Sequence, residues 1–185
     1  HPLPHEGKIA DTASCEVFCF PVKHKIPCHG FLFREKKKPR RIISEKVRSY
    51  GIPETYMEAL KMGKDYIHPK GTIISNEELT EAADAPLQYA FCADTLYHEE
   101  LAAYIKDVDL LYYETTYLKD QDERAEKHHH STTGQAGKMA VIAGVKKLLI
   151  GHFSSKYENL DPFLTETKAV FPNTILAIEG SCIKL

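Results

Sequence analysis

The sequence predicts an α/β fold with one inserted segment, and three observations lead to this prediction. Residues 15–22 and 29–34 are short runs rich in aromatic, β-branched and cysteine side chains, separated by the turn-like KHKIP, which is typical of a β-hairpin. From residue 87 onward, apolar strand-like runs alternate with helical patterns, as in βα units. Between these regions, residues 35–82 contain a basic run and several Gly and Pro residues. We therefore expect one domain over 1–185 that carries an inserted arm over 35–82.

The individual elements are predicted from periodicity and from capping signals. The predicted strands are 15–22, 29–34, 87–92, 109–113, 145–150 and the closing TILAIEG at 174–180. The predicted helices are a short one around 56–62, then 76–83, 97–106, 134–143 and 161–171. Ser75 and Glu78 have capping-box spacing, Asp161 is the expected N-cap of the last helix, and Gly144 ends the helix before it.

Composition describes an ordinary folded chain. The 185 residues are 43% hydrophobic and 27% charged, which is enough to bury a core. A formal net charge of −2 gives no general attraction to polyanions, so nucleic-acid binding has to depend on local basic patches. No apolar run approaches the roughly 20 residues of a membrane span, so we expect no membrane partner. Five cysteines without a C-x-x-C pair are typical of free thiols, and we expect a cytoplasmic protein.

Four polar side chains lie where predicted elements end or begin. His24 follows the first strand, Asp94 follows LQYAFC, His130 precedes the helix 134–143, and His152 follows the strand 145–150. Loops at strand ends surround the functional sites of α/β proteins, and these residue types are common metal ligands and acid–base groups. A carboxylate such as Asp94 can also bridge two cations with one oxygen to each.

Each of these residues also has a plainer interpretation. Asp94 can cap a helix that begins near Leu96, the histidines at 128–130 can form a solvated loop, and His152 can be a loop histidine without a function. At a helix N-terminus, His130 lies near the pole that favours anions. That pole destabilises an imidazolium, so we expect His130 to donate its proton readily.

Signatures of several other catalytic classes do not occur. The sequence has no G-x-S-x-G elbow, no P-loop, no G-x-G-x-x-G after a strand and no H-E-x-x-H helix. The GQAGK at 134–138 lies within a helical pattern rather than in a strand-to-helix loop. These patterns therefore give no support to a serine hydrolase, a P-loop enzyme or a dinucleotide-binding enzyme.

The order of four segments resembles ribonuclease Z of the metallo-β-lactamase superfamily over nearly the whole chain: FPVKHKIPCHGF, CADT, YYETTYL and HHHSTTGQAGKMAVIAGVKKLLIGHFSSKY. The most specific part is HSTTGQA, followed one helix and one strand later by GHFSSKY. The resemblance implies a metallo-β-lactamase-like αββα sandwich, of which this chain is the C-terminal part with an inserted arm. It also implies a zinc-dependent endoribonuclease that removes the 3′ trailer of transfer RNA precursors by hydroxide attack on a phosphodiester.

Site residues and partners carry over by the same resemblance. It implies two zinc ions with His24, Asp94 and His152 among their ligands, and His130 as the catalytic residue that assists the leaving group. The segment 35–82 matches the family's protruding exosite, so we expect its basic residues to bind precursor transfer RNA, although the same run can be a solvated turn. These residues are Lys36, Lys37, Lys38, Arg40 and Arg41. A homodimer is expected, as in the family.

The sequence departs from the family pattern in several places. Ala93 and Tyr113 stand where the family has glycine and histidine, and Ile52-Pro53 stands where the arm usually has a glycine–proline element. The family's H-x-H-x-D-H motif does not occur in the 185 residues, and the sequence begins with His1 rather than Met. We therefore expect a fragment whose motif would lie N-terminal to His1, and we expect the fragment alone to be inactive.

Two other functions are compatible with the sequence. One is a different metallo-β-lactamase-like phosphodiesterase or hydrolase, against which the long arm argues. The other is a non-catalytic RNA-binding or dimerisation module, against which the retained His24, Asp94, His130 and His152 argue. The sequence specifies neither which precursors are cut nor which metal the protein uses.

Overall fold

A computed structural model describes residues 3–184, and the chain divides into two compact units. The first unit combines the chain up to Glu35 with the chain from Leu87 onward, and the second unit is Lys36–Pro86. His1, on which the expectation of a fragment partly rests, lies outside the described residues.

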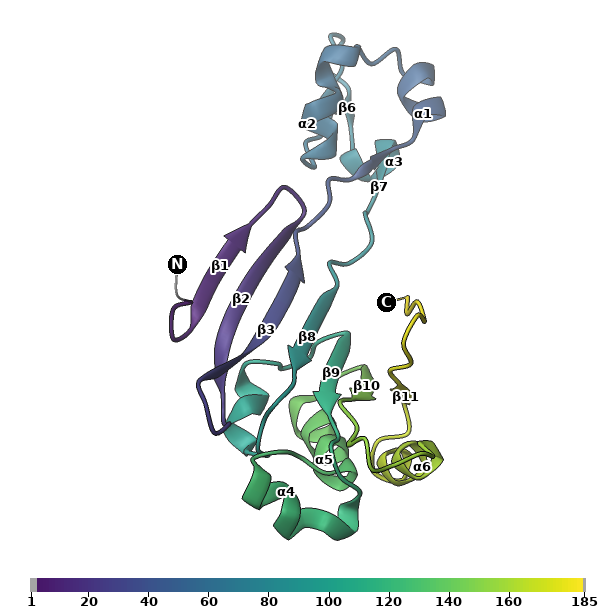
Figure 1. Cartoon of the computed structure of the whole chain (residues 1–185). Helices are drawn as coiled ribbons and strands as arrows, with labels where there is room; N and C mark the ends of the chain where they lie inside the picture. Colours follow the sequence, from purple (N-terminus) through teal and green to yellow (C-terminus); the bar gives the residue numbers. More distant parts are fainter. Residues whose placement is uncertain (1–2, 185) are drawn as a thin grey trace. The chain divides into compact units, whose positions relative to one another are not determined.

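A seven-stranded mixed sheet organises the first unit (Figure 1). Its order is β1 (Gly7–Asp11), β2 (Cys15–Val22), β3 (Cys28–Glu35), β8 (Gln88–Cys92), β9 (Leu110–Glu114), β10 (Lys147–Gly151) and β11 (Thr174–Leu176). Pairing is antiparallel from β1 to β8 and parallel from β8 to β11. The predicted hairpin therefore forms one side of the sheet, and the predicted βα alternation forms the other.

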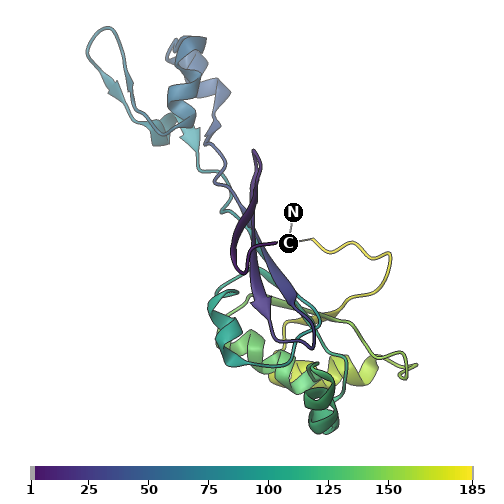
Figure 2. The same cartoon turned by 60° about the vertical axis from the view of Figure 1, so that its left-hand side comes forward.

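Helices connect the parallel strands of this unit and lie along one side of the sheet (Figure 2). They are η2 (Glu99–Ala103), η3 (Lys119–Gln121), α4 (Asp122–His128), α5 (Thr133–Ala143) and α6 (Asp161–Val170). Within residues 3–184, each helix is too short or too polar to cross a lipid bilayer. The described residues thus contain one sheet and one helical layer of the predicted αββα sandwich.

Register across the strands separates a covered sheet face from an open one, because successive side chains of a strand point to opposite faces. One row of residues paired across neighbouring strands is buried in the core that includes α5: Leu32, Ala90, Leu111 and Leu148. The adjacent row, on the opposite face, is Phe31, Phe91, Tyr112 and Leu149. In that second row the rings of Phe91 and Tyr112 stack with centroids 4.6 Å apart and are only partly buried.

Several predicted elements are confirmed by these bounds. Strand β2 has the predicted limits 15–22, and α5 differs from the predicted 134–143 by one residue. Thr132 and Gln135 form a capping box at the start of α5. Gly144 ends the helix with a left-handed φ of 66°, a conformation that glycine adopts without steric cost.

Other predicted elements are wrong in length. The helix expected over 97–106 is only the 3-10 turn η2, because hydrogen bonds from Leu96 N to Lys23 O and from Asp107 N to Ala143 O hold the segment at both ends. The helix expected over 76–83 ends at Leu79, because Thr80 becomes extended and pairs with Ile42. Ser75 makes no side-chain cap there, contrary to prediction. Strand β1 and helix α4 were not predicted.

The second unit has a small core of its own. Its elements are β4 (Arg41–Ile42), α1 (Ser44–Ser49), η1 (Glu54–Tyr56), α2 (Met57–Lys61), β5 (Tyr66–Ile67), β6 (Ile73–Ile74), α3 (Asn76–Leu79) and β7 (Thr80–Glu81). The core residues are Val47, Ile52, Leu60, Tyr66, Ile74 and Leu79. The buried amide of Asn76 donates to Leu60 O at 2.8 Å and to Lys64 O at 3.0 Å, which fixes α3 against α2.

The carboxylate of Asp109 links the starts of three neighbouring strands. It accepts hydrogen bonds from Gln88 N at 2.6 Å and from Lys146 Nζ at 2.6 Å. Burial opposes the charged form, but the bonds from Lys146 and Gln88 outweigh burial and hold the pKa of Asp109 below its ordinary value. Because the pKa is lower in the folded state, this charge stabilises the fold at neutral pH, and the stabilisation is lost as the pH falls through the folded pKa.

We expect Asp109→Asn to lower the free energy of unfolding by about 1 kcal/mol at pH 7. The difference from the unmodified protein should narrow below about pH 4, where the carboxyl becomes protonated. Urea denaturation at several pH values measures both effects, and Asp120→Asn serves as an exposed control with little effect at any pH. A difference of the same size at pH 7 and pH 3 would contradict this account.

Candidate metal centre and active site

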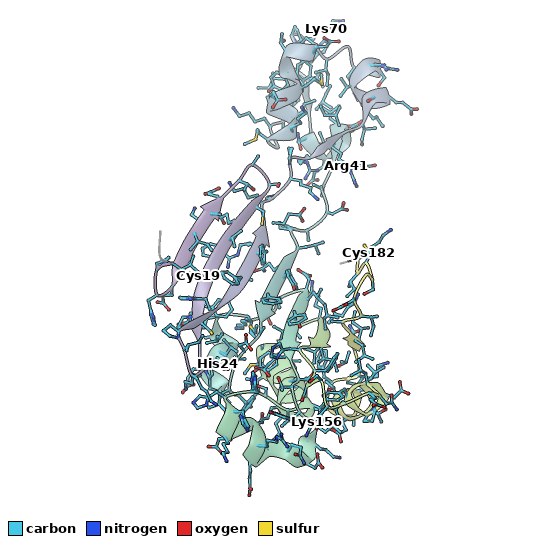
Figure 3. The ribbon with its side chains drawn as sticks, in the orientation of Figure 1. Cys19, His24, Arg41, Lys70, Lys156 and Cys182 are labelled. Atoms are coloured by element: carbon cyan, nitrogen blue, oxygen red, sulfur yellow. The ribbon has the colours of Figure 1, made fainter. Side chains whose placement is uncertain are left out.

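The four side chains singled out from the sequence lie at one end of the sheet in the first unit. His24 is in the loop between β2 and β3, Asp94 follows β8, His152 follows β10, and His130 lies between α4 and α5. Strands β8 to β10 are parallel, so their C-terminal ends meet at one edge. Figure 3 labels His24 at this end of the unit.

Potential ligand atoms of these residues are close to one another. His152 Nε2 lies 3.2 Å from Asp94 Oδ1. One ligand atom from each of His24, Asp94 and His130 lies within 4.8 Å of the other two. Imidazoles and a carboxylate are the donors that zinc and similar divalent ions accept. The residue types and their spacing therefore fit a divalent metal site, while the individual roles of the four residues stay predictions.

Access from solvent is compatible with an ion or an anionic substrate. The side chains of His152 and Asp94 are 39% and 45% exposed. A cavity of about 580 Å³ opens beside His152, between Tyr112 and Ile178. The helix that Asp94 could have capped begins only at Glu99, so the capping interpretation of Asp94 is wrong.

The backbone at this site is held in an uncommon conformation. Asp94, His129 and His152 have φ values of 51°, 60° and 60°, in the left-handed region that costs a residue other than glycine about 1–3 kcal/mol. His129 ends α4 in this conformation, and its carbonyl accepts the Nδ1 hydrogen of His24 at 2.9 Å. This bond fixes the tautomer of His24 and leaves its Nε2 lone pair for a ligand.

A threonine orients the second metal-ligand candidate. His152 Nδ1 lies 3.0 Å from Thr116 Oγ1, and the Thr116 hydroxyl donates to Glu114 Oε2 at 2.6 Å. His152 therefore donates through Nδ1 to the threonine oxygen, and its Nε2 is left facing Asp94. Thr116 thus links the carboxylate of Glu114 to the imidazole of His152 through two hydrogen bonds.

Glu114 is the buried centre of this network. Its carboxylate accepts from Thr95 N at 2.5 Å, from Ser131 N at 3.1 Å, from Thr116, and from His130 Nδ1 at 3.0 Å. Glu114 is also close enough to His130 and His152 to form a second group of possible ligands. Because four donors already occupy its oxygens and its side chain has no exposed surface, we interpret Glu114 as a support for the imidazoles rather than as a ligand.

The pKa of His130 differs from the expectation based on its position before a helix. The hydrogen bond that His130 donates to Glu114 raises the pKa of His130 above its ordinary value, against the opposing effect of burial. The prediction that the helix pole would destabilise its imidazolium is therefore wrong, because a carboxylate at 3.0 Å outweighs a helix whose N-cap is Thr132, two residues further on.

Sequence reasoning missed Glu114 as a functional residue. The available signal was a carboxylate placed directly after the apolar run 110–113, where the buried strand ends. A charged residue at such a position is rare unless it is paired.

The basic residues predicted to bind RNA lie in the second unit. Arg40 donates through Nε to Thr80 Oγ1 at 2.6 Å, and Arg41 lies within 3.8 Å of Glu81 and 3.7 Å of Asp84. Lys36, Lys37 and Lys38 precede them in the same unit. The structure gives both arginines partners inside the unit, and the RNA-binding role of the five residues stays a prediction.

Comparison with known proteins finds relatives in sequence and in structure. No family model matches the chain. A ribonuclease Z from Bacteroides fragilis is 43% identical over 177 residues, which cover 96% of this chain and 58% of that protein. Over nearly its whole length, this chain is similar in sequence to that ribonuclease Z. A ribonuclease Z from Porphyromonas gingivalis is 38% identical over 185 residues and is covered to 59% of its length. The chain thus spans a little over half of these ribonuclease Z relatives.

Solved structures agree on the fold. The short form of human tRNase Z has a TM-score of 0.54 at 19% identity, over 94% of this chain and 44% of that one. The metallo-β-lactamase fold protein YhfI from Bacillus subtilis has a TM-score of 0.58 at 15% identity, over 92% and 49%. The predicted metallo-β-lactamase fold is confirmed, and at these identities the likeness concerns the fold alone.

Replacing Glu114 tests its role as the buried centre. In Glu114→Gln an NH₂ group replaces one acceptor oxygen and faces a backbone N–H, so we expect a loss of about 2–4 kcal/mol in the free energy of unfolding. Urea denaturation measures this loss, with Glu126→Gln on the exposed side of α4 as the matched control. Equal stability of the two variants would show that the network does not support the fold.

Thr116→Val tests the orientation of His152. Valine keeps the side-chain shape but removes the hydroxyl, so we expect the affinity for Zn²⁺ to fall by about 10–100-fold. Competition with a chromophoric chelator measures the affinity, and Thr165→Val on α6 is the control. Unchanged Zn²⁺ affinity in a folded Thr116→Val variant would show that the Thr116 hydroxyl does not orient His152 for metal binding.

Proposed function

We propose that the protein is a metal-dependent endoribonuclease that removes the 3′ trailer of transfer RNA precursors. The observation that carries this proposal is the convergence of His24, Asp94, His130 and His152 at one edge of the sheet, with the Nδ1 atom of each imidazole engaged by a protein acceptor. The high identity to proteins named ribonuclease Z supports this function over that of another hydrolase with the same fold.

Three residues would hold the metal in this proposal. His24 and His152 offer neutral imidazole nitrogens, and Asp94 offers two oxygens that can serve two zinc ions. A divalent metal bound here polarises a phosphoryl oxygen and makes a nucleophile available at neutral pH.

His130 has the complementary task in this proposal. Its Nδ1 hydrogen is held by Glu114, so its Nε2 side is available to the substrate. A proton on that nitrogen can pass to the ribose 3′ oxygen as the phosphodiester breaks, which is the usual contribution of a positioned general acid.

The chain as described offers few ligands for two ions. Catalytic zinc commonly has three protein ligands, whereas His24, Asp94 and His152 together are three for both sites. We therefore propose that this chain alone binds metal weakly and turns over precursor transfer RNA poorly.

The remaining parts of the proposal concern partners and location. The second unit would contact the transfer RNA body through Lys36, Lys37 and Lys38, as the exosite-like arm over 35–82. The partly buried aromatic row of the open sheet face favours a homodimer or another protein cover. A cytoplasmic location agrees with the five free cysteines.

A chimera tests the activity directly. The part of the Bacteroides fragilis relative that this chain does not span, joined to this chain, should cleave precursor transfer RNA in the presence of Zn²⁺. We expect His130→Ala to lower kcat by about 10²–10⁴-fold and Asp94→Asn to abolish metal-dependent cleavage, with His5→Ala as the control.

Two outcomes would contradict parts of this proposal. Cleavage that is insensitive to Asp94→Asn would contradict the assignment of the metal centre. Rapid metal-dependent cleavage by the present chain alone would contradict the proposal that three ligand residues are too few.

A further inference from the structure

A group of cations surrounds Tyr117, and neither the metal centre nor the second unit uses it. Tyr117 lies three residues after Glu114, and its ring is buried. Arg124 Cζ lies 5.5 Å and Lys156 Nζ lies 5.2 Å from the ring centroid. Arg124 belongs to α4, and Lys156 belongs to the loop between β10 and α6. The Tyr117 ring therefore lies against two cations from separate elements, which are attracted to its π face, and Lys156 Nζ also lies 4.6 Å from the centroid of the Tyr157 ring.

Two lysines extend this positive surface. Lys127 follows Arg124 by three residues on α4, the spacing that places side chains on one face of a helix. Lys25 follows His24 in the loop between β2 and β3. Burial lowers the pKa of His128, and the positive charges of Lys25, Arg124 and Lys127 lower it further. We name this group the basic–aromatic patch: Lys25, Tyr117, Arg124, Lys127 and Lys156.

The four cations of the patch are exposed, and among residues 3–184 none of them forms a salt bridge with an Asp or Glu. In contrast, Lys146 pairs with Asp109 at 2.6 Å, and Lys23 pairs with Glu100 at 3.0 Å. Exposed cations without such a salt-bridge partner favour the binding of an anion at that place.

The patch begins at the candidate active site. The rings of Tyr117 and His130 are 6.3 Å apart between centroids. Lys25 is the neighbour of His24 in the sequence. Figure 3 labels Lys156 at the same end of the unit as His24. An RNA strand carries a phosphate at every nucleotide, so a strand with one phosphate beside His130 brings neighbouring phosphates toward these cations.

We propose that the basic–aromatic patch binds the phosphates of unpaired RNA next to the cleaved bond, and that Tyr117 is a positioning residue for Arg124 and Lys156. The inference rests on the proposed function, because that function places a phosphodiester at His130. The Tyr117 ring is buried beneath the two cations, so it does not stack on a base. The patch therefore recognises the RNA backbone rather than its sequence.

Binding of a short RNA tests the patch without any need for catalysis. The probe is a fluorescein-labelled single-stranded RNA of about ten nucleotides, and anisotropy is recorded with EDTA present at salt concentrations between about 50 and 300 mM. The test variant is the double substitution Arg124→Ala, Lys156→Ala. The matched control is Lys138→Ala, Lys168→Ala, which removes two exposed lysines of α5 and α6 that also lack salt bridges.

We expect the test variant to bind roughly tenfold more weakly and the slope of log K against log salt to become shallower by about 1.4, or about 0.7 for each lost phosphate contact. The control should keep the affinity within about twofold and keep the slope. Equal affinities and slopes for the two double variants would overturn the proposal.

Substitution of Tyr117 tests the positioning role. Tyr117→Phe keeps the aromatic face and should keep both the affinity and the salt slope. Tyr117→Leu should weaken binding by roughly threefold. If Tyr117→Leu does not fold, as judged by circular dichroism, the comparison of the two surface double variants still decides whether the patch binds RNA. A Tyr117→Phe variant that loses as much affinity as a folded Tyr117→Leu variant would overturn the cation–π role.

The outcomes separate this inference from the proposed function. If the chimera cleaves precursor transfer RNA while short-RNA binding is insensitive to Arg124→Ala, Lys156→Ala, the patch proposal fails and the function stands. If the chimera does not cleave but the double variant loses RNA affinity as expected, the patch proposal stands and the assignment of the reaction fails.

Discussion

The candidate site depends on one buried carboxylate, that of Glu114. A charged group without exposed surface is tolerated only where hydrogen bonds replace its water, and Glu114 has backbone donors at Thr95 and Ser131 as well as side-chain donors at Thr116 and His130. These donors come from three separate loops at the edge of the sheet. The carboxylate therefore fixes the loops relative to one another and sets the direction of two imidazoles at the same time.

This arrangement also explains where backbone strain is accepted. Asp94 and His152 have left-handed backbones within two residues of a strand end, and His129 has one at the end of α4. Each of these backbone conformations is unfavourable by itself and persists only because contacts with neighbouring residues stabilise it. The Nδ1 hydrogen of His24 bonds to the carbonyl of His129, so the strained residue contributes a main-chain acceptor rather than its side chain.

The sequence predicted the larger part of the fold, and the four candidate residues that it singled out lie close together in the structure. Strand β2 and helix α5 follow from local signals, namely a β-branched and aromatic run and a Thr132 capping box, which tertiary contacts do not override. The segment after Asp94 was wrongly predicted as a long helix, because its end hydrogen bonds come from distant strands and loops. Glu114 was missed for a related reason, since its donors are up to 19 residues away along the chain and no local spacing reveals them. Helix α4 was missed because its last residue begins the histidine run, which favoured a loop interpretation.

The junction of the two units carries a consequence for protein engineering. Glu35 N donates to Leu87 O at 2.9 Å, and Leu87 N donates to the Glu35 carboxylate at 3.1 Å. Glu35 ends β3 and Leu87 directly precedes β8, so the residues on either side of the segment 36–86 are hydrogen-bonded neighbours. Closing these ends with a tight turn would convert β3 and β8 into an ordinary hairpin without changing their register. The segment 36–86 can therefore be removed, exchanged between relatives or replaced by a reporter domain. The entropic cost of closing a loop depends only weakly on the length of the inserted segment.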